Sequence, residues 1–117
     1  MIDLAQALAT VKAPWSPLTV ATVNDYDVRV VKTVGEFTWH SHPETDELFL
    51  VLAGTMTIRL DDGEVTLGPG QLHIVPRGTR HQPFSAEGAE VLLVEPSLTV
   101  NTGDTPGRLT ADRRVSG

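Results

Sequence analysis

Two histidines and a glutamate occur close together in one short segment, and their spacing is typical of a metal site. His40 and His42 are two residues apart, so on an extended strand both side chains point to the same face. A turn through residues 43–46 would then bring Glu47 alongside them. Two imidazoles and one carboxylate form the facial ligand set that leaves open positions on a six-coordinate ion. The alternative interpretation is two ordinary histidines beside the acids of a surface loop.

The segments around these residues have the composition of short β-strands. Apolar and β-branched runs are separated by turn residues such as Asn24-Asp25, Pro69-Gly70 and Arg77-Gly78. The predicted strands cover residues 18–23, 28–34, 47–53, 56–60, 64–67, 72–75 and 91–94. Many short strands at this spacing favour an all-β sandwich or barrel.

Three elements are indicated by more specific patterns. Asp61-Asp62-Gly63 stands between two strand-like runs and predicts a β-hairpin. Asp3 before residues 4–9 predicts an N-cap and one short helix, which Pro14 would end. Residues 47–53 are apolar on both faces beyond Glu47, so we expect this strand to be buried on both sides, by the barrel lumen and by another layer or subunit.

One domain is expected, because 117 residues is the size of a single ordinary core. Residues 1–17 would form the helix and a lead-in, residues 18–100 the barrel, and residues 101–117 a polar, loosely held tail. The amino terminus shows no basic region ahead of an apolar stretch, and no apolar run approaches the ~18 residues of a membrane span. We therefore expect a cytoplasmic protein with no membrane partner.

Composition narrows the chemistry further. The chain has no cysteine, which excludes disulfides and thiolate sites and leaves histidine and carboxylate as the strong ligands. The net charge is −6, and Lys12 and Lys32 are the only lysines, which argues against binding to a nucleic-acid backbone.

Two motifs resemble those of the cupin family. The first is Gly35-x4-His40-x-His42-x4-Glu47-x6-Gly54, and the second is Gly70-x5-Pro76-x-Gly78-x2-His81. The resemblance implies a double-stranded β-helix, the cupin or jelly-roll barrel, preceded by the one short helix. It also implies that one divalent ion, which could be Fe, Mn, Zn, Ni or Co, is held by four residues: His40, His42, Glu47 and His81.

The chain departs from the family pattern at two places. Four residues rather than five separate Gly35 from His40, and Ser85 stands where the family commonly has asparagine. Neither departure removes a proposed ligand.

Several residues beside the motifs are candidates for lining an apolar pocket over the metal: Phe37, Trp39, Phe49, Phe84 and His73. Phe49 is best placed, because it shares the strand face of Glu47. The alternative is that the aromatic residues are plain core and that His73 is a hydrogen-bonded histidine on the barrel wall.

Charged residues near the motifs have simpler expected roles. We expect Glu44 and Asp46 to lie in a solvated loop. Arg77 and Arg80 would either meet an anionic substrate at the barrel mouth or remain ordinary surface charges. With so few lysines, a sugar-phosphate substrate is disfavoured, although some similar cupins carry a mannose-6-phosphate-isomerase-like label.

The resemblance implies a small-molecule metalloenzyme of dioxygenase or isomerase/cyclase type, because four protein ligands leave two positions on an octahedral ion. No general base is indicated by the sequence. Two alternatives stay open: a non-catalytic module that binds a small ligand through the metal, and a metal-free barrel with a structural or partner-binding role. Similar family members are frequently homodimers, so we expect a homodimer.

Overall fold

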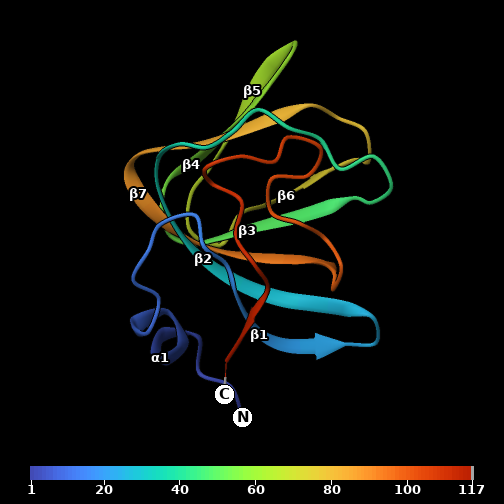
Figure 1. Cartoon of the computed structure of the whole chain (residues 1–117). Coiled ribbons are helices and arrows are strands. Elements are labelled where there is room, and N and C mark those ends of the chain that lie inside the picture. The colour runs from blue at the N-terminus through green and yellow to red at the C-terminus, as the bar shows by residue number, and fades with distance from the viewer. Residues whose placement is uncertain (117) are drawn as a thin grey trace.

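Residues 1–116, which the computed structural model describes, form one short helix and eight strands (Figure 1). The helix α1 spans Leu4–Ala9. The strands are β1 (Leu18–Val23), β2 (Tyr26–Glu36), β3 (Glu47–Gly54), β4 (Met56–Leu60), β5 (Gly63–Leu67), β6 (Leu72–Val75), β7 (His81–Pro96) and β8 (Arg114–Val115). The predicted all-β class with a single amino-terminal helix is confirmed.

The helix begins where the sequence predicts. The Asp3 carboxylate accepts a hydrogen bond from the Gln6 N–H at 3.0 Å, which satisfies a free backbone donor of the first turn. Leu8 and Val11 pack with Leu18 and Val30, so α1 covers part of the outer face of β1 and β2. No helix within residues 1–116 is long and apolar enough to cross a membrane.

Strand β7 is the centre of the sheet. It pairs antiparallel with β4 through its first residues and with β2 and β3 on its two sides through the rest. The hydrogen-bonded order is β5-β4-β7-β2-β1-β8, and β3 also pairs with β6. Because one long strand bends past three others, the sheet curls into a barrel, which fits the predicted double-stranded β-helix.

The prediction for β7 was too short. The sequence indicated a strand only at residues 91–94, whereas the observed strand begins at His81. Pro83 and Gly88 interrupt the strand-like sequence pattern before residue 91, because both residues are typical of turns. Pro83 has no backbone N–H to donate, but its carbonyl still accepts the Phe37 N–H at 2.9 Å.

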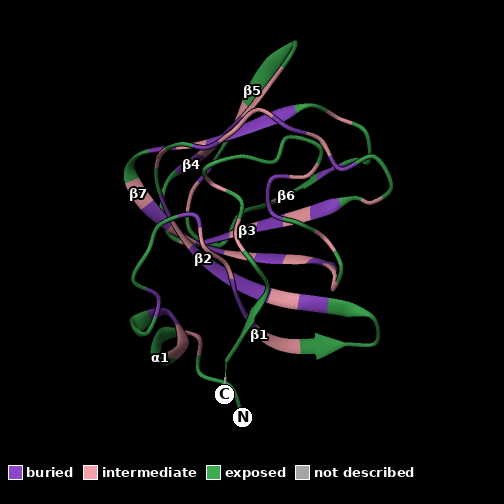
Figure 2. Cartoon of the chain, viewed as in Figure 1, coloured by how far each residue is buried: buried purple, intermediate pink, exposed green. Residues whose placement is uncertain are grey.

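The core lies inside the barrel. Inward-facing side chains of β3, β4 and β7 form one cluster that includes Phe49, Val51, Met56, Ile58 and Val91. Along β3, buried and half-buried residues alternate, as Figure 2 shows by the change of colour. The outward residues Leu48, Leu50 and Leu52 are only half-buried in this chain, so the second layer predicted for this strand is incomplete here.

The carboxyl-terminal segment differs from the loosely held tail that we predicted. Asn101 and Thr102 are buried, and β8 pairs in parallel with β1 at Leu18 and Thr19. The Arg113 guanidinium donates to the buried Asp27 carboxylate at 2.8 Å. The polar composition suggested solvation, but these polar groups have their partners in distant parts of the chain.

Candidate metal centre

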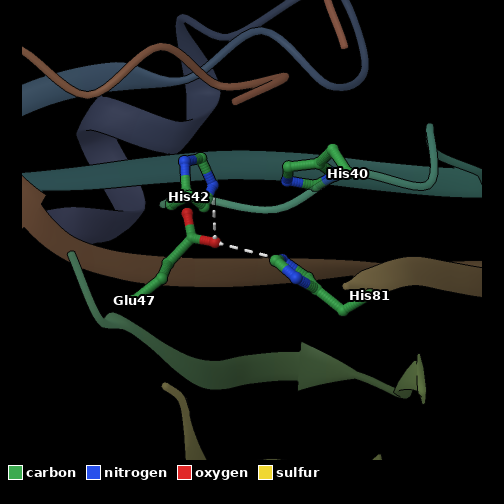
Figure 3. Close-up of side chains that lie close together, drawn as sticks. All are labelled: His40, His42, Glu47 and His81. Carbon is green, nitrogen blue, oxygen red and sulfur yellow. Dashed lines mark ion pairs between the residues drawn. The ribbon is translucent and has the colours of Figure 1, made fainter. Parts of the chain in front are cut away.

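Four side chains converge at one end of the barrel. His40 and His42 follow β2, Glu47 opens β3 and His81 opens β7. All four are buried, and one ligand atom from each lies within 4.8 Å of the others. Figure 3 shows the side chains pointing toward one another. The structure thus brings together the four residues that the two sequence motifs indicated.

Backbone pairing sets the distance between the two motifs. His40 and His81 form an isolated antiparallel bridge, in which the N–H of each donates to the carbonyl of the other at 3.0 and 2.9 Å. Their ring centroids lie 4.4 Å apart. The Gly78 N–H donates to the His42 carbonyl at 2.9 Å, so the turn before His81 is tied to the first motif as well.

Hydrogen bonds also select the tautomer of two imidazoles. The Nδ1 atom of His40 lies 2.8 Å from the Thr38 carbonyl, and that of His81 lies 2.9 Å from the Thr79 carbonyl. A carbonyl oxygen only accepts, so each Nδ1 carries the proton. Each Nε2 of a neutral ring is then left with a free lone pair, the form that ligates a metal.

The ligand atoms have no partner within the protein. His42 Nε2, Glu47 Oε1 and His81 Nε2 are buried and make no hydrogen bond. The two Nε2 atoms lie 3.3 and 3.4 Å from Glu47 Oε1. Buried polar atoms are nearly always satisfied, so a cluster of unsatisfied ones needs an explanation. One ion with imidazole and carboxylate ligands satisfies all of them, and the donor set suits Fe, Mn, Zn, Ni or Co.

The protonation states favour metal binding. Burial, followed by the nearby His81, lowers the pKa of His40 to about 4, so this imidazole is neutral at pH 7. Burial alone would raise the pKa of Glu47, but the close approach of Glu95, His42 and His81 outweighs it and holds that pKa well below its usual value. A neutral imidazole and an ionised carboxylate are the forms that ligate.

Comparison with known proteins agrees with this geometry. Residues 27–96, which span both motifs, match the cupin domain family. The chain belongs to the cupins. A further relative, the uncharacterized protein YdbB of Bacillus subtilis, is 37% identical over 96 residues, which cover 81% of this cupin and 85% of YdbB.

Solved structures show the same fold. A cupin-2 domain containing protein of Shewanella frigidimarina superposes with a TM-score of 0.81 at 36% identity, covering 82% of this cupin and 94% of that chain. Hydroquinone 1,2-dioxygenase of Sphingomonas sp. TTNP3 superposes with a TM-score of 0.72 at 20% identity, covering 82% of this cupin and 32% of that chain. The second likeness is one of fold alone.

A cavity of about 30 Å³ lies inside the barrel of this cupin, beside His40 and Glu47. Its walls are mostly apolar. The lining residues are Trp15, Pro17, Val31, Thr33, Phe37, His40, Glu47, Phe49, Met56, Pro83, Val91, Leu93 and Asn101. Of the predicted pocket residues, Phe37 and Phe49 are among them. Trp15 and Asn101 were missed because they lie outside the motifs and the predicted barrel.

Three other predicted pocket residues lie elsewhere. Trp39 stacks under the Arg80 guanidinium at 4.4 Å, and Phe84 lies under the Arg59 guanidinium at 4.1 Å. His73 is paired with Phe49 across β6 and β3 but is not part of the cavity wall. Aromatic residues beside the motifs therefore fall into two groups, and adjacency in sequence does not separate them.

The charged residues near the motifs are paired with one another outside the cavity. Arg77 Nε lies 3.2 Å from Asp46, and Arg80 lies 2.9 Å from Asp61. Asp46 also accepts the Arg77 backbone N–H at 2.9 Å, which holds the loop before Glu47 against the second motif. Glu44 is exposed, as expected.

A buried charged network behind Glu47 was not predicted. Glu95 lies against Glu47, and its Oε1 accepts a hydrogen bond from Arg29 at 2.7 Å. Arg29 also donates to Asp27, and all three residues of this network are almost fully buried. Burial and the charge of Glu47 raise the pKa of Glu95 well above its usual value. One signal was available in the sequence, since Glu95 continues the inward alternation of Val91 and Leu93.

The carboxyl-terminal segment also contacts the first motif. Asp104 accepts hydrogen bonds from the Ser41 N–H at 2.7 Å and from the Ser41 hydroxyl at 3.0 Å, while its own N–H donates to the Ser41 carbonyl at 3.0 Å. Ser41 separates the two ligands His40 and His42. The segment after the barrel therefore fixes the backbone between them.

Proposed function

We propose that this cupin binds one divalent metal ion through His40, His42, Glu47 and His81 and acts as a metal-dependent dioxygenase on a small, uncharged molecule. The observation that carries the proposal is the cluster of buried ligand atoms with no partner in the protein. A bound iron or manganese ion would supply the redox chemistry.

The cavity wall supports dioxygen chemistry over an isomerase or cyclase. Among the described residues that line it, His40 and Glu47 are the only ones with ionisable side chains, and both are assigned to the metal. An isomerase or cyclase needs a separate group that moves a proton. Dioxygenase chemistry is also compatible with this barrel fold, since hydroquinone 1,2-dioxygenase of Sphingomonas sp. TTNP3 has the same fold.

The same wall disfavours phosphorylated and other strongly anionic substrates. Its described residues include no lysine and no arginine. Arg77 and Arg80, the candidates for binding an anion, are paired with Asp46 and Asp61 instead. An uncharged substrate needs no such partner and matches the apolar wall.

A non-catalytic module that binds a small ligand through the metal is the second candidate. It is favoured by the cavity wall, whose described residues include no ionisable side chain besides His40 and Glu47 to take part in a reaction. Such a module would hold metal and ligand without turnover.

One experiment separates these functions. Untagged protein is analysed for metals, loaded anaerobically with Fe²⁺, and mixed with dioxygen and a panel of compact, uncharged compounds, with His81→Ala as the control. Oxygen consumption with product formation by the wild type alone supports the dioxygenase. One metal per chain with no oxygen consumption for any compound favours the binding module, and failure to bind any divalent ion contradicts both.

A further inference from the structure

One wall of the cavity beside the metal centre is formed by a residue outside the barrel strands. Trp15 lies between α1 and β1, is 8% exposed and lines the cavity. Its ring stacks on Phe37 with 4.8 Å between centroids, and Phe37 packs edge-on against His40 at 5.4 Å. A continuous row of rings therefore runs from Trp15 to a metal-ligand histidine.

The backbone of Trp15 is held in an unfavourable conformation. Its φ is +62°, in the left-handed region that side chains with a Cβ rarely adopt. The backbone N–H donates to the Lys32 carbonyl at 2.8 Å, and the indole N–H donates to the Val34 carbonyl at 2.9 Å. Both acceptors belong to β2, so the ring is fixed against the barrel wall. Strain of this kind persists only where the surroundings determine the conformation.

Asn101 joins the lead-in that contains Trp15 to the carboxyl-terminal segment by hydrogen bonds. Its amide donates to the carbonyls of Trp15 at 3.2 Å and Leu109 at 2.9 Å, and its oxygen accepts the Ala111 N–H at 2.9 Å. Asn101 also lines the cavity. Figure 1 shows the lead-in, in blue, and the carboxyl-terminal segment, in red, on the same side of the barrel. The two segments outside the barrel therefore form one joined cover.

We infer that Trp15 sets the upper size limit of the ligands that reach the metal, an inference that rests on the proposed function. The cavity of about 30 Å³ holds molecules of the size of water or dioxygen. A ligand with one aromatic ring needs more space, and the indole of Trp15 occupies the position where that space would open. The compounds admitted by the wild type are compact and uncharged.

The test compares two probes of different size on Fe²⁺-loaded protein without oxygen. Nitric oxide represents the compact class and is followed by visible absorption, and catechol represents the single-ring class and is followed by titration calorimetry. We expect nitric oxide to bind equally to wild type and Trp15→Ala, and catechol to bind Trp15→Ala more tightly than wild type by about tenfold or more. Trp39→Ala is the matched control, because Trp39 stacks on Arg80 outside the cavity, and it is expected to behave as wild type.

The outcomes are distinguishable because iron content is measured first. If each protein holds one iron and catechol binds wild type as tightly as Trp15→Ala, the inference is overturned while the proposed metal site stands. If none of the proteins holds iron, both fail. Should Trp15→Ala not fold, Trp15→Leu keeps an apolar side chain while removing the indole, and the same comparison applies.

Discussion

At the scale of single residues, the four ligands differ from the remaining histidine. His81 is fully buried and its Nε2 has no partner, whereas His73 is half-buried on β6 and outside the cluster. We predict that His81→Ala lowers the affinity for a divalent metal by more than about 100-fold, and that His73→Ala leaves it nearly unchanged. Calorimetric titration with Zn²⁺ measures both. Circular dichroism should show a folded barrel in each, because neither histidine belongs to the apolar core cluster.

The sequence predicted the ligands better than their surroundings. A histidine that ligates a metal is recognisable by its spacing within a motif, which is why His40, His42, Glu47 and His81 could be named. Glu95 could not, because its importance depends on Arg29 and Glu47, which are distant in sequence and meet only in the folded sheet. The division of the aromatic residues between the cavity wall and the arginine contacts likewise depends on residues that meet only in the folded chain.

Glu95 provides a second residue-scale prediction. Its carboxyl lies between Arg29 and Glu47, so we expect it to position the Glu47 carboxylate. Glu95→Gln keeps an oxygen for Arg29 and presents an amide donor to Glu47, whereas Glu95→Ala removes both contacts. We expect metal affinity to fall about 10- to 100-fold in the alanine variant and to stay near wild type in the glutamine variant. Equal affinity in the alanine variant and wild type would show that Glu95 does not position Glu47.

At the scale of elements, Gly54 and Gly70 both have a left-handed backbone, but a larger side chain is tolerated far less well at Gly54 than at Gly70. Gly54 ends β3 with φ +77°, and a Cβ there would lie 2.4 Å from the Gly88 carbonyl oxygen. Gly70 has φ +81°, but an added Cβ would have no atom within 4 Å.

We therefore expect Gly70→Ala to lower the free energy of unfolding by about 1–2 kcal/mol, the cost of the left-handed backbone alone. Gly54→Ala should cost more than about 4 kcal/mol, because backbone atoms of β7 must also move. Urea denaturation of the two variants measures the difference. A similar decrease in the free energy of unfolding of both variants would mean that the β7 backbone at Gly88 moves away from the added Cβ at little cost.

The hairpin and the short strands were predictable because turn residues mark their ends. The β4–β5 hairpin forms at Asp61-Asp62, as its sequence indicated, and β1, β4 and β6 have the predicted bounds. The first half of β7 and the two-residue β8 were not predictable, because their pairing depends on partners far along the chain. The same reason explains why the segment after residue 100 was taken for a loose tail.

That segment gives a prediction for acid unfolding. The Arg113 hydrogen bond is the largest contribution that holds the pKa of Asp27 well below its ordinary value, with burial opposing it and Ser97, Thr19 and Arg29 assisting. Such a carboxylate stabilises the fold above its ordinary pKa of 3.8, and that stabilisation is lost as the pH falls below it.

Removal of Arg113 raises the pKa of Asp27 in the folded state, so Arg113→Ala should unfold at a higher pH than wild type. Arg108→Ala, an exposed arginine in the same segment, should unfold with wild type. Acid titration followed by tryptophan fluorescence compares the three. Coincident unfolding curves for wild type and Arg113→Ala would mean that Ser97, Thr19 and Arg29 suffice to keep the pKa of Asp27 low.

At the scale of the whole molecule, the outer face of the sheet is apolar and partly uncovered. Two rows of side chains cross β6, β3 and β7 in register, and Leu72 and Ile74 at their ends are 55% and 48% exposed. The rows consist of Ile74, Leu48 and Val94, and of Leu72, Leu50 and Leu92. The helix α1 packs near Val30 and Leu52 and leaves this part of the face open.

A patch of this kind in a monomer marks an interaction surface, and a second copy is the occupant that we propose. The two rows contain no charged side chain in a chain of net charge −6, so the rows of two copies can meet across a two-fold axis without bringing like charges together. A homodimer formed through this surface would match the expectation from the sequence and would complete the second layer over β3.

The prediction is a dimer in solution that one charge disrupts. Light scattering after gel filtration should give wild type twice the chain mass of 12.6 kDa, and Ile74→Glu the mass of one chain. Ile74 is already half-exposed, so the charged side chain reaches water in the monomer and the fold is retained. Val23→Glu, at a similarly exposed position on β1 away from the two rows, should stay dimeric. A monomeric wild type, or a dimeric Ile74→Glu, would exclude this face as the interface.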